Sequence, residues 1–391
     1  MKVDVAVIGA GIHGVGVAQA AAVAGYSVVI LEKHAPASGT SSKSSKLIHG
    51  GLRYLESGQF HLVRECLHER QLLLDNAPDL VSLKHFYIPL YRDTSRPAWK
   101  IRLGLSLYYA LSGCHHSGKF HSIPRHQWEN LDGLRTSDLQ HVYQYWDAQT
   151  DDALLTQAVL HSAQSLGTEL ICPAEVMSCR KQQHEWEIDY LQEEQPRSLR
   201  CRVVINAAGP WVNEILQRTQ PTLSPYPIEL VQGSHIILPE KTAHGIYYVE
   251  APSDRRTIFV MPWKEQTLIG TTEKLFSGRP EDVCATDAEI HYLLETSQTY
   301  FPRLAKYTKE NITAAFAGLR VLPKGSDIAF KRSRDTIIHT DNNEGSGFIT
   351  LYGGKLTAYR ATAEKVLLHA LPLLPRRQVK ANTKELKLSV P

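Results

Sequence analysis

The first 31 residues show two short apolar runs separated by a glycine-rich turn and an alanine- and valine-rich segment. Residues 3–8 and 27–31 are continuous and rich in β-branched side chains, which predicts two strands buried on both faces. Residues 15–24 have helical spacing and predict a helix between them. The order of strand, turn, helix and strand is typical of the unit that opens a parallel α/β sheet.

The same α/β pattern returns in the middle and near the end of the chain. A helix is predicted over residues 152–166. The strands that follow it are predicted near Glu169, Glu185 and Val203. The apolar run 348–352 predicts a closing strand, followed by a helix that starts near Lys355. The predicted sheet is therefore assembled from separate parts of the sequence.

Two insertions lie between these parts, and the second is rich in β-branched runs. These runs cover residues 229–238, 257–261 and 267–271. They predict an α+β substrate domain with a mixed, largely antiparallel sheet. We therefore expect a discontinuous Rossmann-like domain made of residues 1–75, 148–210 and 334–375. The substrate-binding cap is expected at residues 76–147 and 211–333, and a C-terminal tail at 376–391.

Composition narrows the class of protein. Of the 391 residues, 43% are hydrophobic and 21% charged, values typical of globular rather than disordered or fibrous proteins. The formal net charge of +3 is too small to indicate nucleic-acid binding. The 6 cysteines are scattered without a C-x-x-C pair, so we expect reduced thiols in the cytoplasm and no metal site. No apolar run is long enough to cross a bilayer.

Gly9, Gly11 and Gly14 form a G-x-G-x-x-G motif directly after the first predicted strand. The first glycine permits a tight turn, the second lets a pyrophosphate approach the backbone, and the third allows close packing of helix on strand. Glu32 ends the second predicted strand, where a carboxylate accepts hydrogen bonds from an adenosine ribose. An ordinary glycine-rich turn is the alternative, and it does not account for the flanking strands and the acid. The motif alone does not distinguish NAD from FAD.

A polar loop with the sequence GTSSKSSKLIHGGLRYLE occupies residues 39–56. Its hydroxyl groups and paired glycines suit an extended anionic ligand, because they supply side-chain and backbone donors. A solvated serine-rich linker is the alternative. Such linkers seldom lead directly into apolar residues, as this loop does at Leu47 and Ile48.

This loop and the glycine motif before it resemble the FAD-dependent glycerol-3-phosphate dehydrogenases, a family of the DAO-type flavin oxidoreductase superfamily. Further motifs follow in the family's order, and the resemblance runs from residue 2 to about residue 370. They are Arg96-Pro97-Ala98-Trp99, Trp146-Asp147, Asp151-Asp152-Ala153, Asn206-Ala207-Ala208-Gly209-Pro210-Trp211-Val212, Gly233-Ser234-His235-Ile236, Pro262-Trp263, Ile269-Gly270-Thr271-Thr272, Ala317-Gly318-Leu319-Arg320, Arg334-Asp335 and Gly353-Gly354-Lys355-Leu356-Thr357-Ala358-Tyr359-Arg360.

The resemblance implies a glutathione-reductase/DAO-type fold that binds FAD non-covalently. It implies hydride transfer from C2 of sn-glycerol 3-phosphate to flavin N5, which yields dihydroxyacetone phosphate, with electrons passed to quinone or oxygen. The cofactor-binding residues it implies are Gly9, Gly11, Ile12, His13, Gly14, Glu32, Lys33, Thr40, Ser41, Ser42, Ser45, Lys46, Leu47, His49, Gly50, Gly51, Val176, Ala208, Gly209, Trp211, Gly353, Gly354, Lys355, Leu356 and Thr357. Members of the family usually continue into a further helical C-terminal domain, whereas this chain stops soon after its last predicted helix.

A phosphorylated substrate carries close to two negative charges and therefore needs several cations. The basic residues that match the family's substrate site are Arg53, Arg320, Arg334 and Lys355, with Tyr54 and Thr271 beside them. Guanidinium groups suit phosphate oxygens because they donate two parallel hydrogen bonds. A surface ion pair is the alternative for any single one of these residues.

His235 is the expected general base, because an imidazole with a pKa of about 6.5 takes up a proton at neutral pH. A buried core histidine is the alternative, and an alkoxide oriented by Arg320 or a flavin contact by His49 stays open. The glycines before Lys355 are expected to direct N–H groups and the positive end of the following helix at the reduced flavin. The expected catalytic residues are thus His235, Arg320 and Lys355.

Several alternatives stay open from the sequence. Residues 96–111 are basic, aromatic and apolar, which fits a helix lying on the inner face of the cell membrane or an ordinary buried helix. For the oligomeric state, a homodimer and a complex with a partner subunit both stay open. The rival functions are a DAO-superfamily oxidase of a 2-hydroxy acid or amine, and a flavin-binding assembly subunit that receives electrons from a partner.

Overall fold

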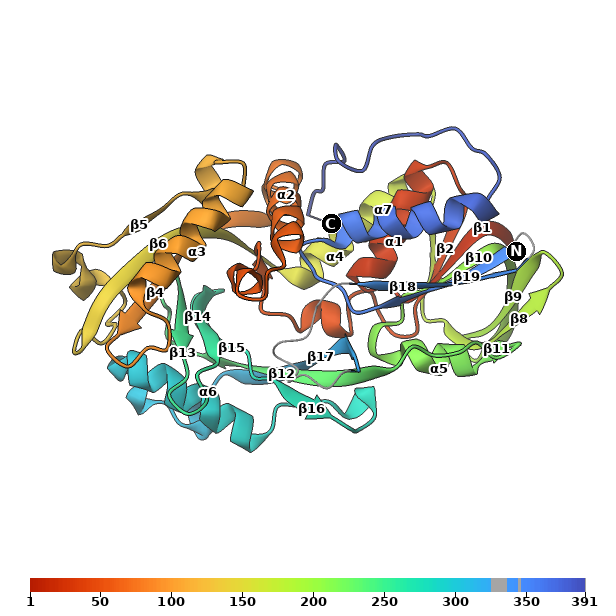
Figure 1. Cartoon of the computed structure of the whole chain (residues 1–391). Helices are drawn as coiled ribbons and strands as arrows, with labels where there is room; N and C mark the ends of the chain where they lie inside the picture. The colour runs from red at the N-terminus through yellow and green to blue at the C-terminus, as the bar shows by residue number, and fades with distance from the viewer. Residues whose placement is uncertain (325–335, 344–345, 391) are drawn as a thin grey trace.

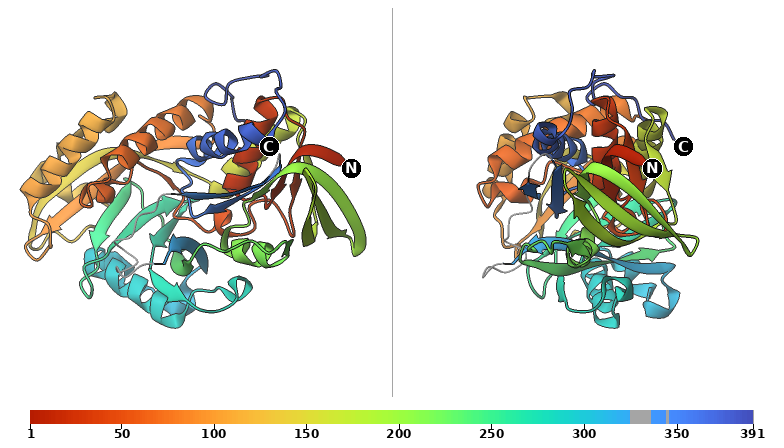
Figure 2. Two further views of the ribbon diagram at one scale, coloured as in Figure 1. Left: turned by 45° about the vertical axis from the view of Figure 1, so that its right-hand side comes forward. Right: turned by 90° about the vertical axis from the view of Figure 1, so that its right-hand side faces the viewer.

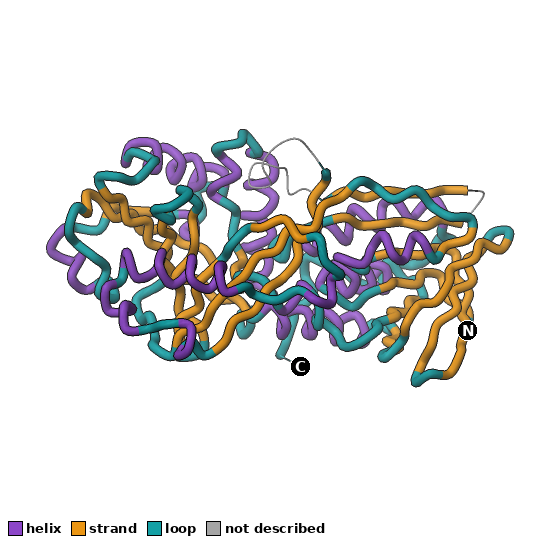
Figure 3. The backbone as a smooth tube through the Cα atoms, turned by 90° about the horizontal axis from the view of Figure 1, so that it is seen from below, coloured by secondary structure: helices purple, strands orange, loops and turns teal. Residues whose placement is uncertain are grey.

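The computed structural model describes residues 1–324, 336–343 and 346–390. Two large mixed sheets lie next to each other, each covered by helices (Figure 1). The molecule is elongated in this view and more compact when it is seen end-on in Figure 2. Seen from below in Figure 3, the strands gather in two groups with helices around them.

The first sheet contains nine described strands and has a parallel centre. Its strands are β1 (Lys2–Ile8), β2 (Val28–Leu31), β7 (Glu169–Ile171), β8 (Glu175–Gln182), β9 (Glu185–Gln192), β10 (Gln195–Asn206), β11 (Thr219–Gln220), β18 (Ile337–Asn343) and β19 (Ser346–Tyr352). β1 pairs in parallel with β2 and β10, β2 pairs with β7, and β10 pairs with β19. This doubly wound sheet, with antiparallel β8–β9 and β18 added, is the predicted Rossmann-like unit.

Both faces of the first sheet are buried, and the alternation along β1 shows why its sequence is apolar throughout. Val5 and Val7 point into the core formed with helices α1 (Ile12–Val23), α4 (Asp152–Ser165) and α7 (Tyr359–Ala370). Ala6 and Ile8 point into the opposite core, which includes residues of the β8–β9 hairpin and of α5 (Val212–Gln217). Burial on both faces removes the polar positions that a half-exposed strand would have.

The second sheet contains ten described strands and is antiparallel except for the pairing of β4 with β13. Its strands are β3 (Leu47–Ile48), β4 (Val81–Tyr91), β5 (Phe120–Ser122), β6 (Leu139–Thr150), β12 (Ile228–Leu238), β13 (Ile246–Glu250), β14 (Thr257–Trp263), β15 (Gln266–Gly270), β16 (Lys274–Phe276) and β17 (Ala314–Pro323). The core on one face includes residues of α6 (Asp287–Tyr300). The core on the other includes residues of α2 (Phe60–Asn76) and α3 (Ala98–Leu111).

The predicted closing helix begins later than expected. The sequence predicts its start near Lys355, whereas α7 begins at Tyr359. Gly353 and Gly354 have φ angles of +75° and +117°, which a right-handed helix does not accept. The chain therefore completes a turn over residues 353–358 before the helix starts, and this prediction was wrong by about one helical turn.

Two short strands lie in a different sheet from their neighbours in sequence. β3, within the segment 1–75, pairs with β6 of the second sheet, and β11, within 211–333, pairs with β8 of the first. The tail packs on helix ends: the N–H of Lys380 donates to the Val23 carbonyl, and its ammonium donates to the Leu166 carbonyl. None of the helices in the described part of the chain has the length and apolar character needed to span a membrane.

Candidate cofactor and substrate site

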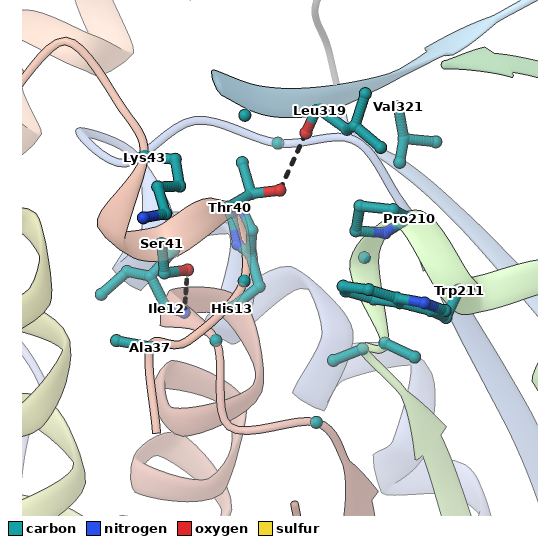
Figure 4. A pocket seen from close by; sticks show the side chains of 18 of the residues that line it. Ile12, His13, Ala37, Thr40, Ser41, Lys43, Pro210, Trp211, Leu319 and Val321 are labelled. Carbon is teal, nitrogen blue, oxygen red and sulfur yellow. Dashed lines mark hydrogen bonds between the residues drawn. The ribbon is translucent and has the colours of Figure 1, made fainter. Parts of the chain in front are cut away.

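A cavity of about 390 Å³ lies at the carboxyl ends of the parallel strands. Gly9 follows β1, Glu32 follows β2, Ala207 follows β10 and Gly353 follows β19, and all four line the cavity. Ligands of open α/β sheets bind in this position. The second sheet contributes residues of β12 and β17 to the lining, so the cavity lies between the two sheets (Figure 4).

The glycine motif forms the turn that brings α1 to the cavity. Gly9 has a φ of +100°, and a Cβ on it would lie 2.8 Å from the carbonyl oxygen of Ala207. A Cβ on Gly14 would lie 1.9 Å from the carbonyl oxygen of Gly9, so only glycine allows this packing. The amino end of α1, with its N–H groups and positive dipole, thus lies where an anionic group is favoured.

Glu32 supports the same turn from the end of β2. Its carboxylate accepts hydrogen bonds from the N–H of Ala10 at 2.8 Å and from the N–H of His34 at 2.9 Å. These bonds use part of its accepting capacity and fix its orientation. The ribose contact expected of Glu32 stays a prediction, made from a side chain that lines the cavity.

The hydroxyl loop, residues 39–46, joins α1 to the second sheet. The Ser41 hydroxyl accepts a hydrogen bond from the N–H of Ile12 at 2.9 Å, and the Thr40 hydroxyl donates to the Leu319 carbonyl at 2.8 Å (Figure 4). Leu319 belongs to β17. The loop therefore fixes the position of the glycine turn relative to the opposite wall of the cavity.

A buried ion pair holds the second half of this loop. The Lys46 ammonium lies 2.5 Å from one carboxylate oxygen of Asp152, and both side chains are buried. The other oxygen of Asp152 accepts hydrogen bonds from the N–H and hydroxyl of Ser44, at 2.9 and 2.6 Å. Asp152 is the first residue of α4, where the helix dipole favours a negative charge. Loss of either charge would leave the other buried without its partner.

His235 lies on β12 and is 1% exposed. Its Nε2 is 2.9 Å from the Ser45 hydroxyl of the loop, and its ring stacks on Phe316 with the ring centroids 4.9 Å apart. Nδ1 is buried and has no hydrogen-bond partner among the described residues. Ser45 therefore stands at the accessible nitrogen of this imidazole.

The surroundings of His235 keep its ring neutral. Burial, and to a lesser extent the nearby positive charges of Arg320 and Lys46, lowers the pKa of His235 to about 3. At neutral pH the ring therefore has a free lone pair but a weak affinity for a proton. A bound dianion would offset the two cations and raise this pKa.

The predicted cations approach the cavity from separate segments. Arg320 and Lys355 line the cavity directly. The Lys355 ammonium lies 5.0 Å from the centroid of the Tyr54 ring, and the Arg53 guanidinium carbon lies 5.9 Å from the same centroid. One Nη of Arg320 is 3.4 Å from the Thr271 hydroxyl. The fold thus gathers positive charge from η2 (Leu52–Leu55), β17 and the turn after β19.

The turn after β19 contacts the glycine motif. A Cβ on Gly354 would lie 2.0 Å from Nε2 of His13, so this glycine leaves room for the imidazole. Nδ1 of His13 is buried and has no partner among the described residues. Burial, and to a lesser extent the Lys355 charge, lowers the pKa of His13 to about 4. His13 is thus a neutral, partly unsatisfied ring in the cavity wall.

A second buried network holds the His49–Gly51 segment. The N–H of Gly50 donates to the Tyr108 hydroxyl at 2.8 Å, and this hydroxyl donates to Asp147 at 2.7 Å. Asp147 forms a buried ion pair with Arg70. A Cβ on Gly50 would lie 2.6 Å from the Tyr108 oxygen. Asp147 of the Trp-Asp motif therefore helps to fix the position of Gly50 through the Tyr108 hydroxyl.

The cavity brings together most of the predicted site residues. Those that line it are Gly9, Gly11, Ile12, His13, Glu32, Lys33, Thr40, Ser41, Ser45, Leu47, His49, Tyr54, Val176, Ala208, Gly209, Trp211, His235, Arg320, Gly353, Gly354, Lys355, Leu356 and Thr357. Those outside its lining are Gly14, Ser42, Lys46, Gly50, Gly51, Arg53 and Thr271. Arg334 lies outside the described residues.

The sequence does not assign site roles to three polar residues that also line the cavity, Lys43, Ser44 and Asp152. Lys43 and Ser44 belong to the loop whose hydroxyls mark it as a ligand site, and Asp152 belongs to the Asp-Asp-Ala motif. Their positions within these motifs were the signal from which a site role could have been predicted. Their contacts depend on residues far away in sequence, which no local pattern specifies.

The site fits a dinucleotide such as FAD. The cavity lining includes Lys33, Val176 and the amino end of α1, as well as His235, Arg320 and Lys355. Gly209 lines the cavity and leaves open the space where a Cβ would lie, and the buried Nδ1 of His13 lacks a partner among the described residues. The described residues contain no group of three or more His, Cys, Asp or Glu suited to a metal ion. Fold and site together define a flavin-dependent oxidoreductase.

The chain belongs to the family of FAD dependent oxidoreductases known as DAO, whose model matches residues 4–360. Its sequence is 38% identical to a glycerol-3-phosphate dehydrogenase of Pseudomonas aeruginosa, over 94% of this chain and 72% of that protein. It is 36% identical to a D-erythritol 1-phosphate dehydrogenase of Brucella abortus, over 95% of this chain and 74% of that protein. Family, fold class and cofactor are thus as the sequence predicts.

A solved structure supports the same assignment. The glycerol-3-phosphate dehydrogenase from Bacillus halodurans, complexed with FAD, superposes with a TM-score of 0.74 and 25% sequence identity. The match covers 99% of this chain and 68% of that one. The protein is therefore a FAD-dependent enzyme.

Proposed function

We propose that this enzyme oxidises sn-glycerol 3-phosphate to dihydroxyacetone phosphate by hydride transfer from C2 to flavin N5. One observation carries the proposal: Arg320 and Lys355 line the same cavity as His235, and Arg320 lies close enough for its charge to lower the pKa of that imidazole. Cations suit the phosphate, and an imidazole suits the hydroxyl proton. The phosphorylated-alcohol names of the two relatives agree with this substrate class.

Bound FAD supplies the hydride acceptor. His235 takes the hydroxyl proton, and the Ser45 hydroxyl at 2.9 Å from Nε2 is the group through which this proton passes. Arg320 and Lys355 bind the phosphate, and their charge favours the developing alkoxide. Lys355 and the backbone N–H groups after β19 would hold the flavin, and they would favour negative charge on its ring.

The two relatives do not decide the chain length of the polyol phosphate that this enzyme prefers. Their names share a phosphorylated polyol and differ in chain length. We expect glycerol 3-phosphate to be the better substrate and D-erythritol 1-phosphate to be accepted less well.

Anaerobic reduction of the bound flavin tests the proposal directly. Purified FAD-loaded protein is mixed with glycerol 3-phosphate, D-erythritol 1-phosphate, lactate or glycine, and bleaching of the yellow colour is followed by absorbance. Bleaching by glycerol 3-phosphate supports the proposal. Bleaching by lactate or glycine alone would instead favour a 2-hydroxy-acid or amine oxidase, and no bleaching by any compound would favour a subunit fed by a partner.

We also propose that electrons pass from the flavin to a quinone at a membrane surface, with oxygen as the alternative acceptor. Helix α3 supports this, because Trp99 and Leu103 are 68% and 62% exposed. Lys100 and Arg102 beside them are exposed and suit anionic headgroups. Co-sedimentation with anionic vesicles tests the contact: Trp99→Ser with Leu103→Ser should weaken binding without changing flavin reduction.

A further inference from the structure

Gly233 of β12 and Gly318 of β17 are cross-strand partners in the cavity wall, and each allows another segment to approach closely. A Cβ on Gly318 would lie 2.8 Å from the Cβ of Lys43 and 2.9 Å from its carbonyl oxygen. A Cβ on Gly233 would lie 2.6 Å from the Thr271 hydroxyl oxygen and 3.0 Å from an Nη of Arg320. The two glycines therefore let Lys43, Thr271 and Arg320 pack directly on this wall.

Lys43 differs from the other lysine of its loop, because no described carboxylate pairs with it. Lys46 is buried and paired with Asp152. Lys43 is half-buried, and among the described residues its ammonium has no carboxylate partner. Its ammonium instead makes a cation–π contact with Phe316, whose ring centroid lies 5.7 Å from Nζ. An interaction of this kind leaves the N–H donors of the ammonium available, since it satisfies charge but accepts no conventional hydrogen bond.

The geometry of β17 brings Lys43 and Arg320 to one face. Phe316, Gly318 and Arg320 occupy every second position of β17, so they lie on the same face of the strand. Lys43 lies against the first two, and the third is the next residue on that face. Thr271 adds a hydroxyl within 3.4 Å of the Arg320 guanidinium. Lys43 and Arg320 thus line the cavity from one face, with the Thr271 hydroxyl beside Arg320, and this combination suits a phosphate dianion.

We infer that Lys43 is a substrate-binding residue, which together with Arg320 holds the phosphate on the cavity face of β17. This inference rests on the proposed function for the identity of the phosphate ester. A phosphate held by Lys43 lies close to Phe316 and to His235, which stacks on Phe316. Binding there therefore offsets cationic charge beside the imidazole and favours proton uptake by it.

Calorimetric titration of the FAD-loaded protein with inorganic phosphate tests the site without turnover. Lys43→Met keeps the length of the side chain and removes the charge, and we expect it to raise the Kd for phosphate about 10- to 100-fold, as for a lost charged hydrogen bond. Lys43→Arg should stay within a few-fold of the wild type. Lys264→Met is the matched control, because Lys264 also lies over an aromatic ring, Trp263, but lies outside the cavity lining.

Anaerobic flavin reduction by glycerol 3-phosphate gives the second readout. Lys43→Met should raise the substrate concentration for half-maximal reduction by the same factor as the Kd for phosphate, with a smaller change in limiting rate. Unchanged phosphate affinity in Lys43→Met, or no phosphate binding by the wild type, would overturn the inference. Phosphate binding that depends on Lys43 in a protein that glycerol 3-phosphate does not reduce would defeat only the proposed substrate.

Discussion

The hydroxyl of Ser45 lies 2.9 Å from Nε2 of His235, although Ser45 belongs to the loop before β3 and His235 to β12, 190 positions further along the chain. His235 is 1% exposed, and its other nitrogen is buried. Ser45 and His235 both line the cavity. We therefore expect a proton from a substrate hydroxyl to reach the imidazole through the Ser45 hydroxyl.

We expect removal of either partner to slow flavin reduction. His235→Asn should lower the limiting rate about 10²- to 10⁴-fold, the usual contribution of a general base. Ser45→Ala should lower it by a smaller factor, about tenfold or more, because the proton loses its relay. Stopped-flow reduction measures both rates. Ser165→Ala is the control, since its exposed hydroxyl donates to the Ser162 carbonyl within α4 and does not line the cavity; a Ser45→Ala rate equal to that of this control would contradict the relay.

The lowered pKa of His235 predicts a specific loss of stability in acid. The folded protein keeps this ring neutral down to about pH 3, whereas the unfolded chain takes up a proton below about pH 6.5. Between these values the unfolded state binds more protons, so the stabilisation is complete above about pH 6.5 and is lost as the pH falls.

Urea unfolding of the apoprotein at pH 7, 6 and 5 measures this loss. His235→Gln should reduce the slope of unfolding free energy against pH by up to about 1.4 kcal/mol per pH unit below pH 6.5. The exposed residue His141 provides the control, and His141→Gln should keep the wild-type slope. Equal slopes in the wild type and His235→Gln would show that the imidazole is already charged in the folded state.

The buried Lys46–Asp152 pair predicts a large loss of unfolding free energy when one of its charged side chains is replaced by an uncharged one. Asp152→Asn leaves the buried Lys46 ammonium without its counter-ion, which costs about 3–5 kcal/mol of unfolding free energy. The double variant Asp152→Asn with Lys46→Met should recover part of this loss, because no buried charge remains. Asp287→Asn removes an exposed carboxylate paired with Lys309 and should change stability by less than about 1 kcal/mol. A double variant no more stable than Asp152→Asn would contradict a charge-based cause.

Two glycine-to-alanine substitutions should change the stability of the protein in opposite directions. Gly14→Ala places a methyl group 1.9 Å from the Gly9 carbonyl oxygen, so we expect loss of FAD retention and of stability. Gly104 lies inside α3, where a Cβ would be 3.9 Å from Leu52 and no closer to any other residue. Gly104→Ala should raise the unfolding free energy by up to about 1 kcal/mol. Thermal unfolding and the absorbance ratio of flavin to protein measure both effects.

Local features of the chain could be predicted wherever local chemistry decides them. The turn at Gly9, the helix after it and the polar loop depend on residues close in sequence, and motif order along the chain identifies the family and its cofactor. The start of α7 was predicted too early because the positive φ angles of Gly353 and Gly354 extend the turn. The roles of the individual site residues stay predictions, although most of those residues line one cavity.

The sequence by itself therefore determined the fold class, the family and its cofactor, because glycine, hydroxyl and apolar patterns act over short distances. Only the tertiary structure decided which charges are buried together. It pairs Lys46 with Asp152, packs Lys43 on Gly318 and Arg320 on Gly233, and lowers the pKa of His235 to about 3. Desolvation and charge proximity depend on contacts between distant segments, and only folding brings those segments together.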